Sequence, residues 1–282
     1  MATAPPPLKT PPPPQKRPPT RPSNGPAIPA QKFTVEHGKT LAFHKTVVYG
    51  PGGVGKSELC SLLADAGVKP VFIDLDMETE HLDVSRYRLS SFAELRALLH
   101  DEKELSPFGA IVVDSLTKAE ELAIEWTLTN VKHDKGHAVD SIEGYGYGKG
   151  FTHVYETFLK LLGDLDAVIR LGKHVVCTAH DCTTNVPNPM GEDWIRWEPR
   201  LQHPGSGKAS IRLRVKEWCT HMLYIGYDQL VNKDGKATGS GTRTIYPREL
   251  PTHLAKSRTL ADPIPYVQGD SILWKQLFTQ EK

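Results

Sequence analysis

One segment of the chain has residue types and spacing that suit phosphate binding. It fits the P-loop pattern G-x-x-x-x-G-K-[ST] at every fixed position. Its eight residues are Gly50, Pro51, Gly52, Gly53, Val54, Gly55, Lys56 and Ser57. Glycines let backbone N–H groups close around phosphate oxygens, a lysine here reaches the β- and γ-phosphates, and the adjoining hydroxyl holds Mg²⁺. The segment therefore predicts a site for ATP and Mg²⁺.

The flanking residues predict the framework that this chemistry requires. Residues 46–49 are β-branched or aromatic and predict a short buried strand, and residues 58–66 carry leucines at helical spacing. A strand, a glycine-rich turn and a helix N-terminus together direct N–H groups toward one anion. A chance glycine turn is the alternative, and this context disfavours it.

Polar residues follow the other predicted strands, where a nucleotide pocket would lie. Asp114 ends an apolar run, a Walker B pattern that predicts a second Mg²⁺ ligand beside Ser57. Asp76 and Glu78 are candidates for the carboxylate that orients the attacking water, and Asp76 is preferred. His180 follows a fourth strand and is predicted to contact the γ-phosphate and report its state.

Each of these assignments has a structural alternative. A strand-terminal aspartate such as Asp114 can cap the next helix. The acidic residues between positions 74 and 80 can be a solvated loop, and His180 can be a surface histidine.

The rest of the chain alternates between short apolar runs and amphipathic stretches. Strands are predicted at residues 70–76, 110–114 and 174–179, and helices at residues 91–100, 118–127 and 151–171. This alternation predicts an α/β fold with a mainly parallel central sheet flanked by helices. Residues 229–231 and 242–246 predict a C-terminal β-hairpin, with Asp234-Gly235 as its turn.

Composition divides the chain into three parts. The first 30 residues contain twelve prolines, four basic residues and no acidic ones, so residues 1–31 are predicted to be a disordered basic arm. That arm is either a tether for a partner protein or nucleic acid, or a solubilising tail. Residues 32–262 form the predicted ATPase domain, and residues 263–282 a tail with a short helix.

Charge and cysteine content limit the function classes. A net charge of +1 indicates no global attraction to nucleic acid or membrane, so any DNA contact would need a local patch. Four cysteines without C-x-x-C spacing suit a reducing cytoplasm. No apolar run approaches the length of a membrane span and no signal peptide is visible, so we expect a cytoplasmic protein without a membrane partner.

Taken together, these segments resemble the RecA-like P-loop ATPases. They are most similar to a phage-encoded branch of AAA-type ATP-binding proteins, some of which act in single-strand annealing and recombination. The resemblance covers about residues 44–260. It rests on YGPGGVGKS, VFIDLD, AIVVDS, GYGYGKGF, HVVCTAHD, WIRWEP and AKSR. The P-loop and Walker B segments are superfamily-wide, whereas GYGKGF, the strand-terminal histidine, WIRWEP and AKSR indicate the phage branch.

The resemblance implies an ATPase that acts on single-stranded DNA in phage recombination, annealing or replication. Such a protein would work as a homo-oligomeric ring or filament in the host cytoplasm. Asp76 falls where RecA-like proteins carry a catalytic glutamate, and His180 where they carry a glutamine sensor. Lys256 and Arg258 resemble the basic pair that these ATPases insert into a neighbour's nucleotide site.

Two stretches, residues 137–150 and 182–208, fall where RecA-like proteins have mobile DNA-binding loops. The residues predicted to contact DNA there are Tyr145, Tyr147, Lys149, Arg196, Trp197, Arg200 and Lys208. Aromatic rings interleaved with basic residues suit single strands, because any base can stack and any phosphate can pair. Ordinary solvated loops are the alternative.

A second hypothesis belongs to another class of protein. The chain would be a nucleotide-dependent switch or scaffold that hydrolyses ATP weakly and recruits partners through its proline-rich arm. The presence of Asp76 in place of a glutamate favours this reading.

Overall fold

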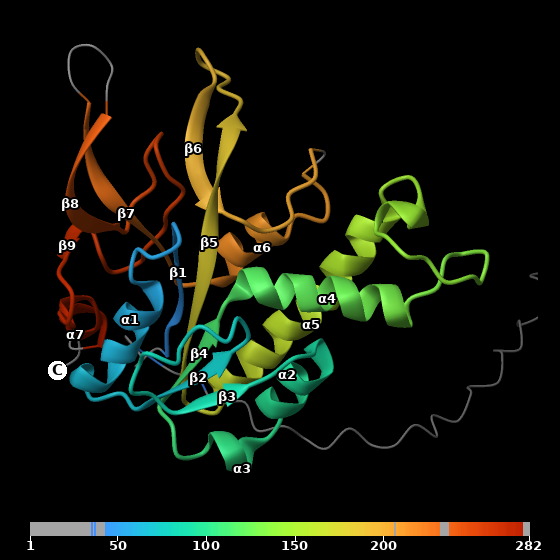
Figure 1. Cartoon of the computed structure of the whole chain (residues 1–282), viewed down its shortest axis with the longest axis horizontal. Coiled ribbons are helices and arrows are strands. Elements are labelled where there is room, and N and C mark those ends of the chain that lie inside the picture. The colour runs from blue at the N-terminus through green and yellow to red at the C-terminus, as the bar shows by residue number, and fades with distance from the viewer. Residues whose placement is uncertain (1–34, 36, 38–42, 206, 232–236, 279–282) are drawn as a thin grey trace, which may run out of the picture. The chain divides into compact units, whose positions relative to one another are not determined.

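The computed structural model describes residues 35, 37, 43–205, 207–231 and 237–278, and every element below lies in the unit Leu41–Lys282. The predicted basic arm at residues 1–31 and the predicted turn at Asp234-Gly235 fall outside the described residues. Within the described part, one sheet has the strand order β3-β2-β4-β5-β1-β7-β8-β9, and β6 pairs with β5 (Figure 1).

The centre of the sheet is parallel, as the sequence predicts. Its parallel strands are β1 (Lys45–Gly50), β2 (Pro70–Asp74), β3 (Arg86–Arg88), β4 (Ala110–Asp114), β5 (His174–Val186) and β7 (His221–Val231). Every residue of β2 and β4 is buried. Strands covered by helices on both faces need apolar side chains at every position, which is why these segments are continuous apolar runs.

Helices cover both faces of the sheet (Figure 1). On one face lie α1 (Lys56–Ser61), the 3₁₀ helix η1 (Leu62–Ala66) and α7 (Ile272–Phe278). On the other lie α2 (Phe92–Leu99), α4 (Leu116–Asn130), α5 (Lys149–Arg170) and α6 (Ile211–Trp218). Two short helices, α3 (Glu102–Leu105) and η2 (Glu143–Tyr145), complete the described set. Each of these helices is too short or too polar to cross a bilayer.

Local sequence explains where these helices begin. Ser91 and Glu94 form a complete capping box at the start of α2. Ser115 and Ser210 accept backbone N–H groups at the starts of α4 and α6. In α5, Phe158, Leu161 and other apolar residues at helical spacing pack against the sheet.

The predicted C-terminal hairpin is present and longer than expected. β7 pairs antiparallel with β8 (Ala237–Tyr246), and β9 (Ile264–Tyr266) pairs with β8. The segment expected as a tail therefore contributes a strand and helix α7 to the same unit.

One predicted loop is wrong. β5 continues beyond the predicted end at residue 179 to Val186 and pairs antiparallel with β6 (Trp194–Pro199). Residues 182–186 and 194–199 are thus a β-ribbon that extends from the sheet (Figure 1), not loops. Alternating residues of β6 are half-buried and exposed near its start, a strand pattern that its mixed polar and aromatic composition obscures in the sequence.

Candidate nucleotide site

The P-loop lies between the end of β1 and the start of α1. A Cβ atom on Gly50 would lie 2.1 Å from the carbonyl oxygen of Ile225 in β7, so only glycine allows the two strands to approach this closely. Gly55 caps α1 with a φ of 99°, a left-handed conformation that favours glycine. The backbone conformation therefore requires or favours glycine at both of these fixed positions of the motif.

Lys56 is buried within the loop that it follows. Its Nζ donates hydrogen bonds to the carbonyl oxygens of Gly50 and Pro51, both at 2.9 Å. Burial lowers the pKa of Lys56, while the nearby carboxylates of Asp114 and Asp181 oppose that shift. The lysine is thus folded back along the P-loop, where it lines the pocket.

Asp114 and Ser57, the two residues predicted to bind Mg²⁺, lie within hydrogen-bond contact of each other. The buried Asp114 carboxylate at the end of β4 accepts hydrogen bonds from the hydroxyls of Ser57 and Thr178. Burial raises the pKa of Asp114, and these two hydrogen bonds lower it. The helix-cap alternative is wrong for Asp114, because the cap of α4 is Ser115, whose Oγ accepts the N–H of Lys118 at 3.2 Å.

The three acidic residues at the end of β2 and just after it have different environments. Asp74 is fully buried and accepts hydrogen bonds from the backbone N–H groups of Glu78 and Thr79, so it holds the loop in place. Asp76 lines the pocket and accepts a 2.7 Å hydrogen bond from the Ser115 hydroxyl. Glu78 is exposed and also lines the pocket. Both Asp76 and Glu78 therefore stay candidates for positioning water.

His180 lies within β5 and lines the same pocket. Its backbone N–H donates to the Thr117 hydroxyl at 3.0 Å, and its carbonyl accepts the N–H of Arg200 at 2.8 Å. The position thus connects the pocket to α4 and to the end of β6.

These residues share a cavity of about 310 Å³. Its lining residues are Gly52, Gly53, Gly55, Lys56, Ser57, Glu58, Asp76, Glu78, His81, Asp114, Ser115, His180, Arg243 and Gln268. Among the described residues, no group of three or more His, Cys, Asp or Glu is arranged to hold a metal ion. A hydroxyl and one carboxylate suit Mg²⁺, which takes its other ligands from phosphates and water.

Three residues predicted to contact DNA make internal contacts. Tyr145 is only 2% exposed, and its hydroxyl donates to the carbonyl oxygens of Thr127 at 3.2 Å and Val131 at 2.5 Å. Trp197 is half-buried and stacks on Tyr224, with ring centroids 5.6 Å apart. The prediction for Tyr145 is wrong, because packing uses the ring surface that a base would need. Trp197 keeps part of its surface exposed, so its contact with DNA stays a prediction.

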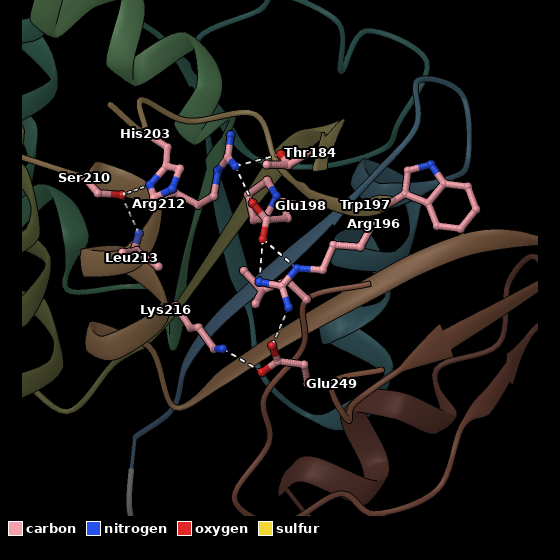
Figure 2. Close-up of polar contacts among 12 residues, drawn as sticks. Thr184, Arg196, Trp197, Glu198, His203, Ser210, Arg212, Leu213, Lys216 and Glu249 are labelled. Atoms are coloured by element: carbon pink, nitrogen blue, oxygen red, sulfur yellow. Dashed lines mark hydrogen bonds and ion pairs between the residues drawn. The ribbon is translucent and has the colours of Figure 1, made fainter. Parts of the chain in front are cut away.

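Arg196 is the third of these residues, and it belongs to a chain of ion pairs (Figure 2). The chain runs through Arg212, Glu198, Arg196, Glu249 and Lys216. The Arg196 side chain is 13% exposed and both of its carboxylate partners lie within 2.7 Å. It fixes the β5–β6 ribbon to the segment after β8, so its prediction as a DNA contact is also wrong.

The other predicted DNA contacts lie on the surface. Tyr147 is fully exposed in a turn with a φ of 50°, and Lys149 is exposed and forms an ion pair with Asp134. Arg200 and Lys208 are exposed as well. Their contact with DNA stays a prediction.

Lys256 and Arg258, the basic pair near the C-terminus, have different environments. Lys256 donates to the carbonyl oxygens of Lys216 and Cys219 at 2.8 and 2.7 Å, where it caps the end of α6. The prediction that Lys256 enters a neighbour's site is therefore wrong. Arg258 is exposed beside His221, at the end of the sheet opposite the P-loop, and stays a candidate for a role in a neighbouring copy.

Several residues of the site were missed by sequence reasoning. Thr178 donates to Asp114 and Ser115 donates to Asp76, and Ser115 directly follows the aspartate of the Walker B pattern. Arg243 and Gln268 line the pocket from β8 and from the segment after β9, and no sequence signal marks them.

Comparison with known proteins supports the assignment of residues 50–57 as a P-loop. Residues 42–259 match a family described as "AAA domain". Comparison with curated proteins gave no match. Among solved structures, the flagellar accessory protein FlaH from Methanocaldococcus jannaschii is 11% identical, with a TM-score of 0.34, and the match covers 72% of this chain and 78% of that one. The RadB recombinase is 16% identical, with a TM-score of 0.35, over 72% of this chain and 80% of that one.

At these identities and TM-scores, neither solved structure bears on the activity of this chain. The family match is different, because it spans most of the folded part and includes the P-loop, Asp114 and His180. The chain belongs to the AAA domain family.

Proposed function

We propose that this protein is a Mg²⁺-dependent ATPase. The observation that carries the proposal is the placement of Lys56, Ser57 and Asp114 in one pocket, in a chain of the AAA domain family. The P-loop N–H groups would bind the phosphates, and Ser57 and Asp114 would hold Mg²⁺, which supplies charge neutralisation at the β- and γ-phosphates.

The residues around the γ-phosphate position would carry the remaining roles. Asp76, oriented by Ser115, accepts a hydrogen bond from the attacking water and aligns it, and Glu78 is the alternative for this role. His180 contacts the terminal phosphate and transmits its presence through Thr117 and Arg200.

The test measures phosphate release from ATP with Mg²⁺ and with excess EDTA. Wild-type protein is expected to hydrolyse ATP only with Mg²⁺, and Lys56→Ala to abolish hydrolysis. Lys69→Ala is the matched control, because Lys69 lies outside the pocket lining and contacts the Phe108 ring. Hydrolysis that persists in Lys56→Ala would overturn the proposal.

We further propose that single-stranded DNA acts as an effector of this ATPase in recombination, annealing or replication, with phage-encoded relatives as the expected context. Four exposed residues support this part: Tyr147, Lys149, Arg200 and Lys208. An exposed tyrosine near basic side chains can stack on a base while the cations bind phosphates. Added oligonucleotide should raise turnover in wild type and not in a Tyr147→Ala, Lys149→Ala double variant. Equal turnover with and without DNA would remove the DNA role and leave the ATPase.

Assembly into a ring or filament is the third part of the proposal, and Arg258 supports it. Its position at the far end of the sheet prevents a contact with the P-loop of its own chain, so a catalytic role would require a neighbouring copy. Light scattering with ATP and DNA tests assembly. A monomer under every condition would exclude a role for Arg258 in a neighbour's site.

The weakly hydrolysing switch stays a second candidate, because the pocket carboxylate that Ser115 holds is an aspartate, Asp76, rather than a glutamate. Asp76→Glu discriminates between the two. A large gain in turnover would indicate an assembled site limited by the short side chain, whereas unchanged turnover would remove Asp76 from the mechanism.

A further inference from the structure

The P-loop has neighbours on two sides of the sheet. β1 lies between β5 and β7, so Asp114 at the end of β4, Asp76 after β2 and the histidine of β5 flank the loop on one side. Strands β7, β8 and β9 flank it on the other side and bring a different set of side chains to it.

Three of these side chains donate hydrogen bonds to three consecutive P-loop carbonyls. Tyr227 donates to Gly53 at 3.2 Å, Arg243 Nη1 to Val54 at 2.9 Å, and Tyr266 to Gly55 at 3.4 Å. When the carbonyls of a loop are bound from outside, its N–H groups are left to face the ligand. The C-terminal strands therefore fix the shape of the P-loop.

Arg243 differs from the two tyrosines because it also lines the pocket. Its guanidinium lies over the Tyr266 ring, 4.5 Å from the centroid, which fixes its plane. Among the described residues no carboxylate lies within ion-pair distance of Arg243, and its one hydrogen bond to Val54 leaves other N–H donors for a ligand. A half-buried arginine without an acidic partner, at the wall of an anion site, is suited to bind an anion.

The position of Arg243 along the loop indicates which part of the nucleotide it meets. Asp114 contacts Ser57 and so marks the β/γ-phosphate end of the pocket. Arg243 contacts Val54 and lies against Gly55, on the opposite side from the Asp76, Asp114 and His180 wall. The phosphates nearer the ribose would occupy that side.

We propose that Arg243 is a phosphate-binding residue of the nucleotide pocket, contributed from β8 of the same chain, and that it contacts the phosphate chain at the end remote from Asp114. This inference rests on the proposed nucleotide site. It assigns the residue to substrate binding rather than to sensing of the γ-phosphate, so ADP and ATP should depend on it equally.

Calorimetric titration with MgADP and with Mg²⁺ and ATPγS tests the assignment. Arg243→Gln keeps a side-chain N–H for the Val54 carbonyl and removes the charge. We expect it to weaken binding of both nucleotides by about 10- to 100-fold, the usual effect of losing a hydrogen bond to a charged group. Arg243→Lys should recover part of the loss. In steady-state hydrolysis KM should rise while kcat stays unchanged.

The controls separate a binding role from a structural one. Arg248→Ala removes the same charge from an exposed position after β8 and should bind as wild type. Thermal melting of each variant shows whether the hairpin is intact. Wild-type affinity in Arg243→Gln would show that the residue only supports the loop, and a loss confined to ATPγS would show a γ-phosphate contact; either result overturns the inference. If the wild type itself bound no nucleotide, both the proposed function and this inference about Arg243 would fail.

Discussion

The two sides of the P-loop are built in opposite ways. On the β4–β5 side, the Asp114 carboxylate at the end of β4 contacts the hydroxyls of Ser57 and Thr178, and His180 lies within β5. On the β7–β9 side, an arginine and two tyrosines contact the carbonyl oxygens of the loop itself. In the proposed ATPase, one side would present groups for the reaction, and the other holds the backbone that would receive the phosphates.

This difference predicts different consequences of mutation. Groups on the β4–β5 side would interact with charge that develops during hydrolysis, so their loss should lower turnover. Groups on the β7–β9 side support structure and binding, so their loss should lower stability or affinity. The comparison would fail if a β4–β5 variant lowered only stability or affinity, or if a β7–β9 variant lowered only turnover.

The largest effect is expected at Trp274, behind the β7–β9 side. This fully buried residue of α7 donates from Nε1 to the Leu59 carbonyl of α1 at 2.6 Å. Trp274→Ala should lower the free energy of unfolding by about 3–5 kcal/mol, since it removes a large core side chain and a hydrogen-bond donor. Urea unfolding measures the change, and Trp274→Phe should lose less. A loss below about 1 kcal/mol in Trp274→Ala would contradict the supporting role, because that is less than core truncations cost.

The next effect concerns Asp114 on the opposite side. Asp114→Asn should reduce kcat by about 10²–10³-fold, because a neutral amide binds Mg²⁺ poorly and stabilises less transition-state charge. The steady-state rate of phosphate release at saturating Mg²⁺ and ATP gives kcat. The unfolding midpoint should not fall, because burial already disfavours the charged form of this carboxyl and raises its pKa. A stable variant with normal turnover would remove Asp114 from the site.

A somewhat smaller effect should identify the carboxylate that positions water. Asp76→Asn is expected to lower kcat by about 10²-fold, and Glu78→Gln to leave it nearly unchanged, because only Asp76 is oriented by a hydrogen bond from Ser115. Turnover of the two variants under the same conditions decides between the candidates. The reverse ranking would assign the role to Glu78.

The smallest predicted effect is on pH dependence, at Glu120 of α4. Its carboxylate accepts the backbone N–H of Gln202 beside the end of β6, and burial raises its pKa to about 7. The folded state therefore holds a proton that the unfolded state releases near pH 4.5, the ordinary value for glutamate. This contribution is complete below about pH 4.5 and is lost as pH rises through about 7.

Thermal melts at pH 5, 6, 7 and 8 measure this contribution against Glu120→Gln. The wild type should lose stability relative to the variant as pH rises through this window, with the difference largest at pH 8. Glu121→Gln is the matched control, because Glu121 is exposed and pairs with Lys118 at the surface. Parallel pH profiles for wild type and Glu120→Gln would contradict the prediction.

The sequence by itself determined the parts of the site that are contiguous in the chain. The P-loop, Asp114 and the parallel strands around them were predictable, because the glycine pattern, the apolar runs and the strand-end carboxylate are each local signals. Physical necessity explains this: a strand buried on both faces must be apolar throughout, and Gly50 cannot carry a Cβ so close to Ile225.

Tertiary structure alone decided which polar and aromatic residues are available for function. Tyr145, Arg196 and Lys256 have types that suit DNA or a neighbour's phosphates, yet each is bound by partners distant in sequence. Arg243 shows the converse, since it carries no motif and reaches the P-loop only because β7, β8 and β9 extend the sheet beside β1. Residue type sets what chemistry a side chain can do, and the packing of distant strands sets whether it is free to do it.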